Sequence, residues 1–252
     1  MKKENITKGL RSKIENLSNF EDGPYIYTIR QFAEKSEKER TVALKALNGL
    51  HQEGFLLKGK IPKYPGDKIE ALYYYGLTEE GKKFLGIYRK KLNPFYRPEK
   101  HSFKLAVDEN RIRHELGITQ SLLTYKKLIK NKEGASIIKM DFGAMLEDKE
   151  RDIIIKPDLL IKSMQVDLDN SGDERFYTYF IEFDAGSMKK WMLEEKIQKY
   201  CALCSQKVVF FVINDARKIE IENLIENIKN EDNYLKLHNP GLNFTVKALE
   251  IL

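Results

Sequence analysis

The chain has 252 residues, of which 42% are hydrophobic and 33% charged, with a formal net charge of +6 and a pI near 9.0. This length suits one large domain or two modest ones, and the apolar content is sufficient for real cores. No apolar run approaches the roughly 18 residues of a membrane span, and the basic start MKKENITKGL is followed by no apolar segment of signal-peptide type. These features argue against a membrane-spanning or globally disordered chain and predict a cytoplasmic protein with no membrane partner.

The positive charge is concentrated in the first two-fifths of the sequence. Residues 1–100 contain 21 Lys and Arg against 13 Asp and Glu, a net charge of +8, whereas the remainder has a net charge of −2. A localised excess of positive charge favours a polyanionic partner for that part of the chain.

The N-terminal part alternates helical and strand patterns. Gly54 is predicted to end a helix as a C-cap, and Thr78 to begin one as an N-cap. Apolar residues recur at roughly helical spacing at Val42, Leu44, Leu47, Leu50 and His51. The predicted order is helices at 5–17, 28–34 and 38–53, a strand at 55–60, a hairpin tip at 61–70, a strand at 71–78 and a helix at 78–92.

The stretches LKALNGLHQEGFLLKGK and ALYYYGLTEEGKKFL resemble the closing half of bacterial winged helix-turn-helix domains, here residues 1–87. The resemblance implies a helix in the major groove of double-stranded DNA and a basic wing on its backbone. The alternative is a charged, solvated face on a winged helix that contacts proteins. The expected groove contacts are Lys38, Arg40, Thr41 and Lys45, and the expected backbone contacts are Lys60, Lys63 and Lys68.

Residues 88–109 combine proline with basic residues and have no clear period, so we expect a basic linker. Residues 110–252 alternate helical and strand patterns and predict an α/β domain with a mixed central sheet. The apolar run VVFFVI predicts a strand covered on both faces. The expected elements are a helix at 110–131, strands at 136–142, 152–163 and 177–184, a helix at 187–204, a strand at 207–214, a helix at 216–229 and a strand at 243–252.

The cysteines Cys201 and Cys204 have Cys-x-x-Cys spacing, but no second Cys/His pair at ligand spacing accompanies them. They continue a helical stripe that includes Leu193, Ile197 and Tyr200. We therefore expect both thiols to be reduced and to lie on the buried face of a helix.

Three acids lie in strand-like apolar runs, where a carboxylate is costly to bury without a partner. Asp158 follows Pro157 in KPDLLI, and Glu182 and Asp184 alternate in YFIEFDAG. The layout resembles the PD-(D/E)XK nuclease fold, which implies that the three acids bind a metal such as Mg²⁺ that would activate water. Asp184, however, stands where that fold has a lysine, so hydrolysis is in doubt unless Lys196 on the next helix reaches the acids.

The motifs RHELGIT, KPDLLI, YFIEFDAG and KIQKY together resemble the replication-relaxation family of Gram-positive plasmids and integrative elements. The resemblance implies a winged helix joined to a nuclease-like domain, tied to plasmid replication, mobilisation or DNA topology. For each residue alone the alternative is structural: a helix-surface histidine, a turn-starting aspartate, or acids that cap a helix. The implied catalytic positions are His114, Asp158, Glu182, Asp184, Lys196 and Tyr200.

Three functions follow as expectations. The first is a DNA-binding protein of a plasmid or mobile element, acting in replication, transfer or regulation, whose nuclease-like domain is degenerate and serves dimerisation or partner contact. The second is a Mg²⁺-dependent DNA endonuclease or nickase that uses Asp158, Glu182, Asp184 and Lys196. The third is a repressor whose second domain senses a ligand. All three have double-stranded DNA as partner, and a homodimer on an inverted repeat is compatible with each.

Overall fold

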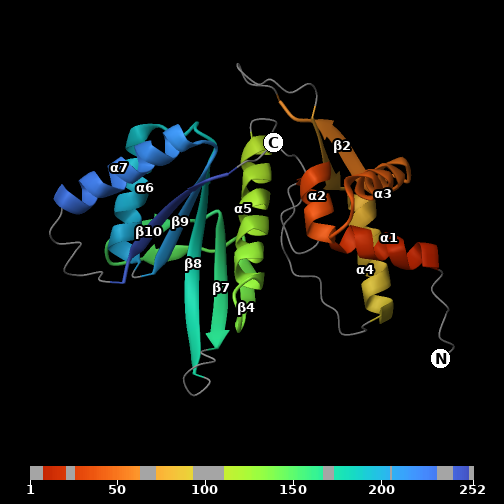
Figure 1. Ribbon diagram of the computed structural model, residues 1–252, viewed down its shortest axis with the longest axis horizontal. Coiled ribbons are helices and arrows are strands. Elements are labelled where there is room, and N and C mark those ends of the chain that lie inside the picture. The colour runs from red at the N-terminus through yellow and green to blue at the C-terminus, as the bar shows by residue number, and fades with distance from the viewer. Residues whose placement is uncertain are drawn as a thin grey trace. The chain divides into compact units, whose positions relative to one another are not determined.

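The computed structural model describes residues 8–20, 26–62, 72–92, 111–166, 173–204, 206–231 and 241–249 (Figure 1). The chain forms two compact units, residues 1–119 and 120–252. The division falls within helix α5 (Ile112–Lys130), so the first turns of this helix belong to the first unit and the remainder to the second. The predicted linker at 88–109 lies mostly outside the described residues, although helix α4 continues to Leu92.

The first unit combines helices with a small antiparallel sheet whose strand order is β1-β3-β2. Its helices lie close to their predicted positions, and both strands of the predicted hairpin are present. Its elements before α5 are α1 (Lys8–Ser18), β1 (Ile26–Thr28), α2 (Ile29–Ser36), α3 (Arg40–Gln52), β2 (Leu56–Lys60), β3 (Tyr73–Leu77) and α4 (Glu79–Leu92).

Local hydrogen bonds fix the limits of α2 and α3. Thr28 and Gln31 form a capping box at the start of α2, in which the Gln31 N–H donates to Thr28 Oγ1 (3.2 Å) and the Thr28 N–H donates to Gln31 Oε1 (3.0 Å). Glu37, with φ of 53°, ends α2 in the left-handed region, so α3 begins at Arg40 and not at Lys38. Gly54, with φ of 79°, follows the end of α3 as predicted.

The buried face of α3 includes only part of the apolar spacing noted in its sequence. Ala43, Leu47 and Leu50 are buried in the core of the first unit, whereas Val42 and Leu44 are 49% and 37% exposed. The buried stripe runs at i, i+4 and i+7 through the small Ala43, which apolar size alone does not single out. Val42 and Leu44 lie on either side of this stripe.

The sequence Leu-Thr-Glu-Glu-Gly has a packing explanation. The Gly81 N–H donates to Thr78 Oγ1 (3.0 Å), which makes Thr78 the N-cap of α4 as predicted. The Thr78 hydroxyl lies 2.9 Å from the Phe55 carbonyl oxygen. A Cβ at Gly81 would collide with that same oxygen, so only glycine allows the start of α4 to pack this closely on the chain before β2.

The first turns of α5 pack on β1 and the end of β2. Ile112 and Leu116 share a small core with Ile26 and Ile61. The Gln31 amide donates to the Leu116 carbonyl oxygen (2.8 Å), and further along α5 the Thr119 hydroxyl contacts the Ile26 carbonyl oxygen (3.1 Å). The compact first unit therefore extends beyond the helix that the sequence predicted as its end.

The second unit is built on a five-stranded sheet of order β10-β9-β8-β7-β4. The strands from β4 through β7 to β8 pair antiparallel, and those from β8 through β9 to β10 pair parallel, so the sheet is mixed, as predicted. Its elements after α5 are β4 (Ala135–Asp141), β5 (Leu146–Asp148), β6 (Ile153–Ile155), β7 (Leu159–Val166), β8 (Glu174–Asp184), α6 (Lys190–Leu203), β9 (Lys207–Val212), α7 (Asp215–Glu231) and β10 (Asn243–Ala248).

The single strand predicted at 152–163 is wrong. It is divided into β6, which pairs with β5 in a separate hairpin, and β7 of the main sheet. The residues between them are Lys156, Pro157 and Asp158, and a proline supplies no N–H to a strand ladder. Asp158 therefore immediately precedes β7 and is not part of a strand.

Helices cover both faces of the sheet (Figure 1). Helices α6 and α7 pack on one face, where Leu193, Ile197 and Ile221 meet Phe180 and Phe210. The second part of α5 packs on the other face, with the Tyr125 and Tyr179 ring centroids 4.9 Å apart. Strand β9 is buried along nearly its whole length, as predicted for a central strand.

The two cysteines lie buried in the core beneath α6, as predicted. In the part of the chain that the structure describes, no helix combines the length and the apolar character needed to cross a bilayer.

Candidate functional site

The outward face of α3 is basic. Arg40, Thr41 and Lys45 are exposed, and α3 contains no acidic residue. Lys38 precedes the helix, and its ammonium donates to Asn16 Oδ1 (2.5 Å) of α1. Three of the four predicted groove residues thus share the surface of α3, whereas Lys38 connects the turn before α3 to α1.

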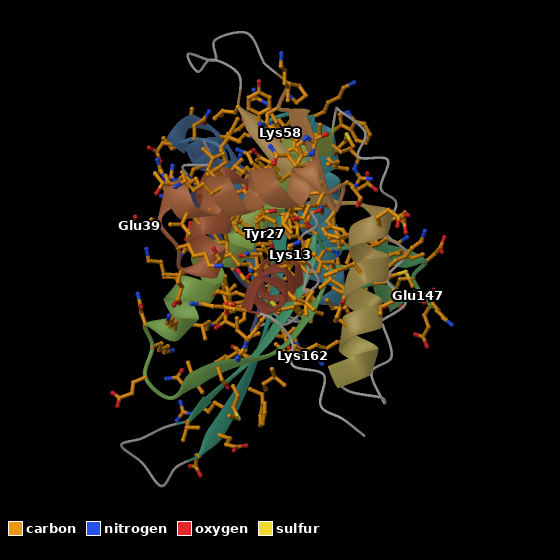
Figure 2. All side chains as sticks on the ribbon, turned by 90° about the vertical axis from the view of Figure 1, so that its right-hand side faces the viewer. Lys13, Tyr27, Glu39, Lys58, Glu147 and Lys162 are labelled. Atoms are coloured by element: carbon orange, nitrogen blue, oxygen red, sulfur yellow. The ribbon has the colours of Figure 1, made fainter. Side chains whose placement is uncertain are left out.

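The strand next to this helix adds further positive charge. Lys60 is exposed on β2, and the Lys58 ammonium lies 4.5 Å from the centre of the Tyr73 ring, within reach of a cation–π interaction. Figure 2 labels Lys58 on β2 and Glu39 at the start of α3. The predicted wing residues Lys63 and Lys68 lie outside the described residues.

A second cluster forms where β7 begins beside β8. Leu159 is paired with Ile181, so Asp158 and Glu182 lie next to each other one step further along this antiparallel pair. Asp158 Oδ2 accepts a hydrogen bond from the Phe183 N–H (2.7 Å). The two carboxylates that the sequence predicts to be neighbours are therefore brought together.

Helix α6 supplies two groups to Glu182, which is only 2% exposed. The Lys196 ammonium lies 2.5 Å from Oε2, and the Tyr200 hydroxyl donates to Oε1 (2.6 Å). Lys196 and Tyr200 are one helical turn apart and point to the same strand. Lys196 thus reaches the acids, which the sequence alone left open.

The charges of this cluster do not cancel. Burial raises the pKa of Glu182, and the nearby Asp158 carboxylate raises it further. Lys196 and Tyr200 lower the pKa, but by less, so that it is about 8. Burial alone would lower the pKa of Lys196, but Glu182 and Asp158 outweigh it, so this pKa is raised and the ammonium stays charged. Burial, with Glu182 next in weight, raises the pKa of Tyr200. Two carboxylates beside one ammonium leave an excess negative charge, which a proton on Glu182 neutralises.

Asp184 has a different partner. Its Oδ2 accepts from Arg217 Nε (2.6 Å), and its Oδ1 accepts from the Gly186 N–H (2.8 Å). The Arg217 guanidinium also donates to the Met188 carbonyl oxygen (2.7 Å) and to Glu220 (2.7 Å). Asp184 is buried, so this guanidinium neutralises a carboxylate that would otherwise be costly to enclose.

Sequence reasoning missed Arg217, although the sequence contains a signal for it. Strands β8 and β9 are parallel, and Asp184 is paired with Val212 at the end of β9. Asn214 caps the next helix by accepting from the Arg217 N–H (2.8 Å), which places Arg217 in the first turn of α7. A basic residue in the first turn after β9 lies at the same sheet edge as an acid that ends β8.

The predicted metal ligands do not form one three-carboxylate group. Among the described residues, no set of three or more His, Cys, Asp or Glu side chains is arranged to hold a metal ion. Asp184 is paired with Arg217, and both oxygens of Glu182 already have partners. Mg²⁺ is bound through carboxylate oxygens and water, and in this arrangement Lys196 and Arg217 occupy oxygens of Glu182 and Asp184 that the prediction assigned to the ion.

His114 lies in the first turns of α5, where it is partly buried. By its position it belongs to the first unit, whereas Asp158, Glu182, Lys196 and Tyr200 belong to the second. The catalytic role implied for His114 therefore stays a prediction.

Comparison with known proteins gives one finding. A family model described as replication-relaxation matches residues 23–210. The matched span includes α3, the acids of the second unit, Lys196 and Tyr200, and it ends before Arg217. A search of curated proteins gave no match.

Proposed function

Because the chain belongs to the replication-relaxation family, we propose that it is a DNA-binding protein of a plasmid or another mobile element, acting in replication, transfer or their regulation. Membership of the family suggests a role in plasmid or mobile-element replication or relaxation and an interaction with nucleic acid. In this proposal the first unit is a winged helix-turn-helix domain that binds double-stranded DNA. The second is a PD-(D/E)XK nuclease-like domain whose catalytic site is degenerate.

The observation that carries this proposal is the acid-free, exposed face of α3. Arg40, Thr41 and Lys45 project from a helix that packs through its other side. The major groove of B-DNA is wide enough to admit such a helix. Lys60 on β2 and the net charge of +8 over residues 1–100 supply the attraction for phosphates on which DNA affinity depends.

The ion pairs of the second unit support the degenerate assignment. Glu182 is engaged by Lys196 and Tyr200, and Asp184 by Arg217. Through these ion pairs Glu182 connects α6 to the sheet and Asp184 connects α7 to it. A structural role of this kind accounts for carboxylates in apolar strands without requiring hydrolysis.

The test is binding of labelled duplex DNA by fluorescence anisotropy at several salt concentrations. Replacing Lys45 by Ala, or Arg40 by Ala, should lower affinity and reduce the slope of log K against log salt by about one unit per lost phosphate contact. Lys83→Ala is the matched control, because Lys83 lies on α4 and is paired with Glu80 (2.9 Å). Equal affinities for wild type, Lys45→Ala and Arg40→Ala would contradict the proposal.

A metal-dependent endonuclease or nickase is the second candidate, and one observation favours it. The Lys196 ammonium reaches Glu182 beside Asp158, which supplies two acids and a lysine at one end of adjacent strands. The test is incubation of supercoiled plasmid with Mg²⁺ or Mn²⁺ and either wild type or the Asp158→Ala/Glu182→Ala variant. Metal-dependent nicking by the wild type but not by the variant would establish the enzyme. Intact plasmid, together with salt-sensitive binding, would support DNA binding without cleavage.

A further inference from the structure

The last turn of α3 contains a glycine that packing does not explain. A Cβ at Gly49 would meet no atom of the described residues within 4 Å. Glycine inside a helix is less favourable than alanine because it loses more conformational freedom on folding. Gly81 differs, because a Cβ there would collide with the Phe55 carbonyl oxygen. The described structure therefore gives Gly49 no internal reason to lack a side chain.

Gly49 lies on the outward side of the helix. It is one turn after Lys45 and one turn before Gln52, both of which are exposed. The inward side is formed by Ala43, Leu47 and Leu50. A partner that lies along the exposed face of α3 would thus meet bare backbone at Gly49. In Figure 2 the helix starts near the labelled Glu39, and Lys58 is labelled on β2 of the same unit.

The neighbouring residue, Asn48, is held in place from inside the domain. Tyr75, fully buried on β3, donates its hydroxyl proton to Asn48 Oδ1 (2.8 Å). This bond restricts the side chain and leaves Nδ2 as the Asn48 atom that Tyr75 does not engage. Asn48 is one turn from Lys45, so amide and ammonium lie on adjacent parts of one surface. A fixed amide is suited to reading the hydrogen-bonding edge of a base in the major groove.

We propose that Gly49 is the point at which α3 comes closest to double-stranded DNA, with Asn48 reading a base edge and Lys45 contacting the groove beside it. Tyr75 is then a positioning residue that orients Asn48 without touching DNA. The charge of α3 favours DNA as the partner of this surface, because the helix contains Arg40 and Lys45 and no acidic residue. The inference rests on the proposed function and extends the contact surface from Arg40, Thr41 and Lys45 to the last turn of α3.

A side-chain series at Gly49 tests the close approach. Gly49→Ala and Gly49→Leu are compared with Gly86→Ala and Gly86→Leu, because Gly86 lies inside α4 and a Cβ there also meets nothing within 4 Å. Both alanine variants should raise the thermal midpoint by about 2–6 °C, since each replaces a helical glycine. Affinity for a duplex selected by the wild-type protein from a random-sequence library should fall about tenfold for Gly49→Ala and further for Gly49→Leu. The Gly86 variants should keep wild-type affinity.

Tyr75→Phe tests the positioning role. It retains the buried ring and removes only the hydroxyl that holds Asn48. We expect a smaller ratio between affinity for the selected duplex and affinity for a scrambled duplex, with binding to the scrambled duplex unchanged. Asn48→Ala should behave in the same way. A merely structural role for the hydroxyl would instead lower the thermal midpoint and both affinities together, which would overturn this part of the inference.

The outcomes separate the inference from the function on which it rests. Wild-type affinity in Gly49→Ala, together with weakened binding in Lys45→Ala, would overturn the inference and leave DNA binding intact. A lower thermal midpoint in Gly49→Ala would also overturn it, because the position would then not be open. Failure of wild type and both Gly86 variants to bind any duplex would overturn the proposed function, and the inference with it.

Discussion

Lys196 and Glu182, fourteen residues apart in sequence, form an ion pair of 2.5 Å in which the carboxylate is almost completely enclosed. Breaking a buried pair from one side leaves an unmatched charge, which typically costs more than the intact pair contributes. The pair therefore provides a direct test of the second unit's architecture.

At pH 9, above the Glu182 pKa of about 8, replacing Lys196 by Met should lower the free energy of unfolding by about 3–5 kcal/mol, because the ionised Glu182 and Asp158 then face each other without a cation. Urea denaturation followed by circular dichroism measures the loss. Lys199→Met is the matched control, since Lys199 is more exposed on the same helix and paired with Glu195 (2.7 Å); its effect should stay within about 1 kcal/mol. Equal effects of the two substitutions would show that the buried pair is not a special contributor.

The raised pKa of Glu182 predicts a pH dependence of stability. The folded state binds a proton up to about pH 8, whereas the unfolded carboxyl releases it near 4.5, so the folded state holds more protons in between. Stability from this group should therefore fall as pH rises from 4.5 to about 8, and level off above it. Denaturant midpoints across this range for wild type and Glu182→Gln provide the measurement, and the variant should have a flatter profile. If the wild-type denaturant midpoint instead rises between pH 4.5 and 8, and rises more than that of Glu182→Gln, the predicted direction of the pH dependence is wrong.

Arg217 should be more important for stability than its charge alone suggests, because it joins Asp184, Met188 and Glu220. Arg217→Ala should lower the free energy of unfolding by about 3 kcal/mol, since it leaves the buried Asp184 carboxylate without a cation. Arg217→Lys should retain only part of this stability, because an ammonium cannot form the same planar set of hydrogen bonds as a guanidinium. Lys218→Ala, in a looser pair with Glu222 (3.9 Å), serves as the control in thermal unfolding.

The two leucines of α3 should respond differently to truncation. Leu47→Ala removes a fully buried side chain and should cost about 2–5 kcal/mol. Leu44→Ala removes one that is 37% exposed, and should cost under about 1 kcal/mol. Denaturant unfolding of the two variants distinguishes them, and a similar loss in both would mean that the helix faces inward along a different stripe.

Sequence patterns predicted most elements because helix caps and apolar periods are local. Thr78 and Gly54 fixed element ends through contacts within a few residues or with the adjoining turn. The sequence could not predict which of Val42, Ala43 and Leu44 faces the core. Ala43, the smallest of the three, is buried, and this depends on tertiary packing and not on apolar size. The split of the 152–163 segment was signalled by Pro157, but its hairpin partner β5 has little apolar periodicity.

The candidate site was predicted in part for similar reasons. The resemblance to the nuclease fold implied that Asp158 and Glu182 are neighbours, and the register of β7 with β8 brings them together. The distance from Lys196 to Glu182 depends on how α6 crosses the sheet, and Arg217 depends on the parallel pairing of β8 with β9. Residue spacing does not give the first, and it signals Arg217 only once β8 and β9 are known to pair in parallel.

The pairing of each β8 acid with a different helix has a consequence for sequence variation within the family. Loss of Lys196 alone leaves a buried carboxylate unmatched, and so does loss of Arg217 alone. Substitutions at Glu182 and Lys196 are therefore expected to occur together in relatives, as are those at Asp184 and Arg217. Because the two pairs use separate cations from separate helices, one pair can be exchanged for apolar residues while the other persists.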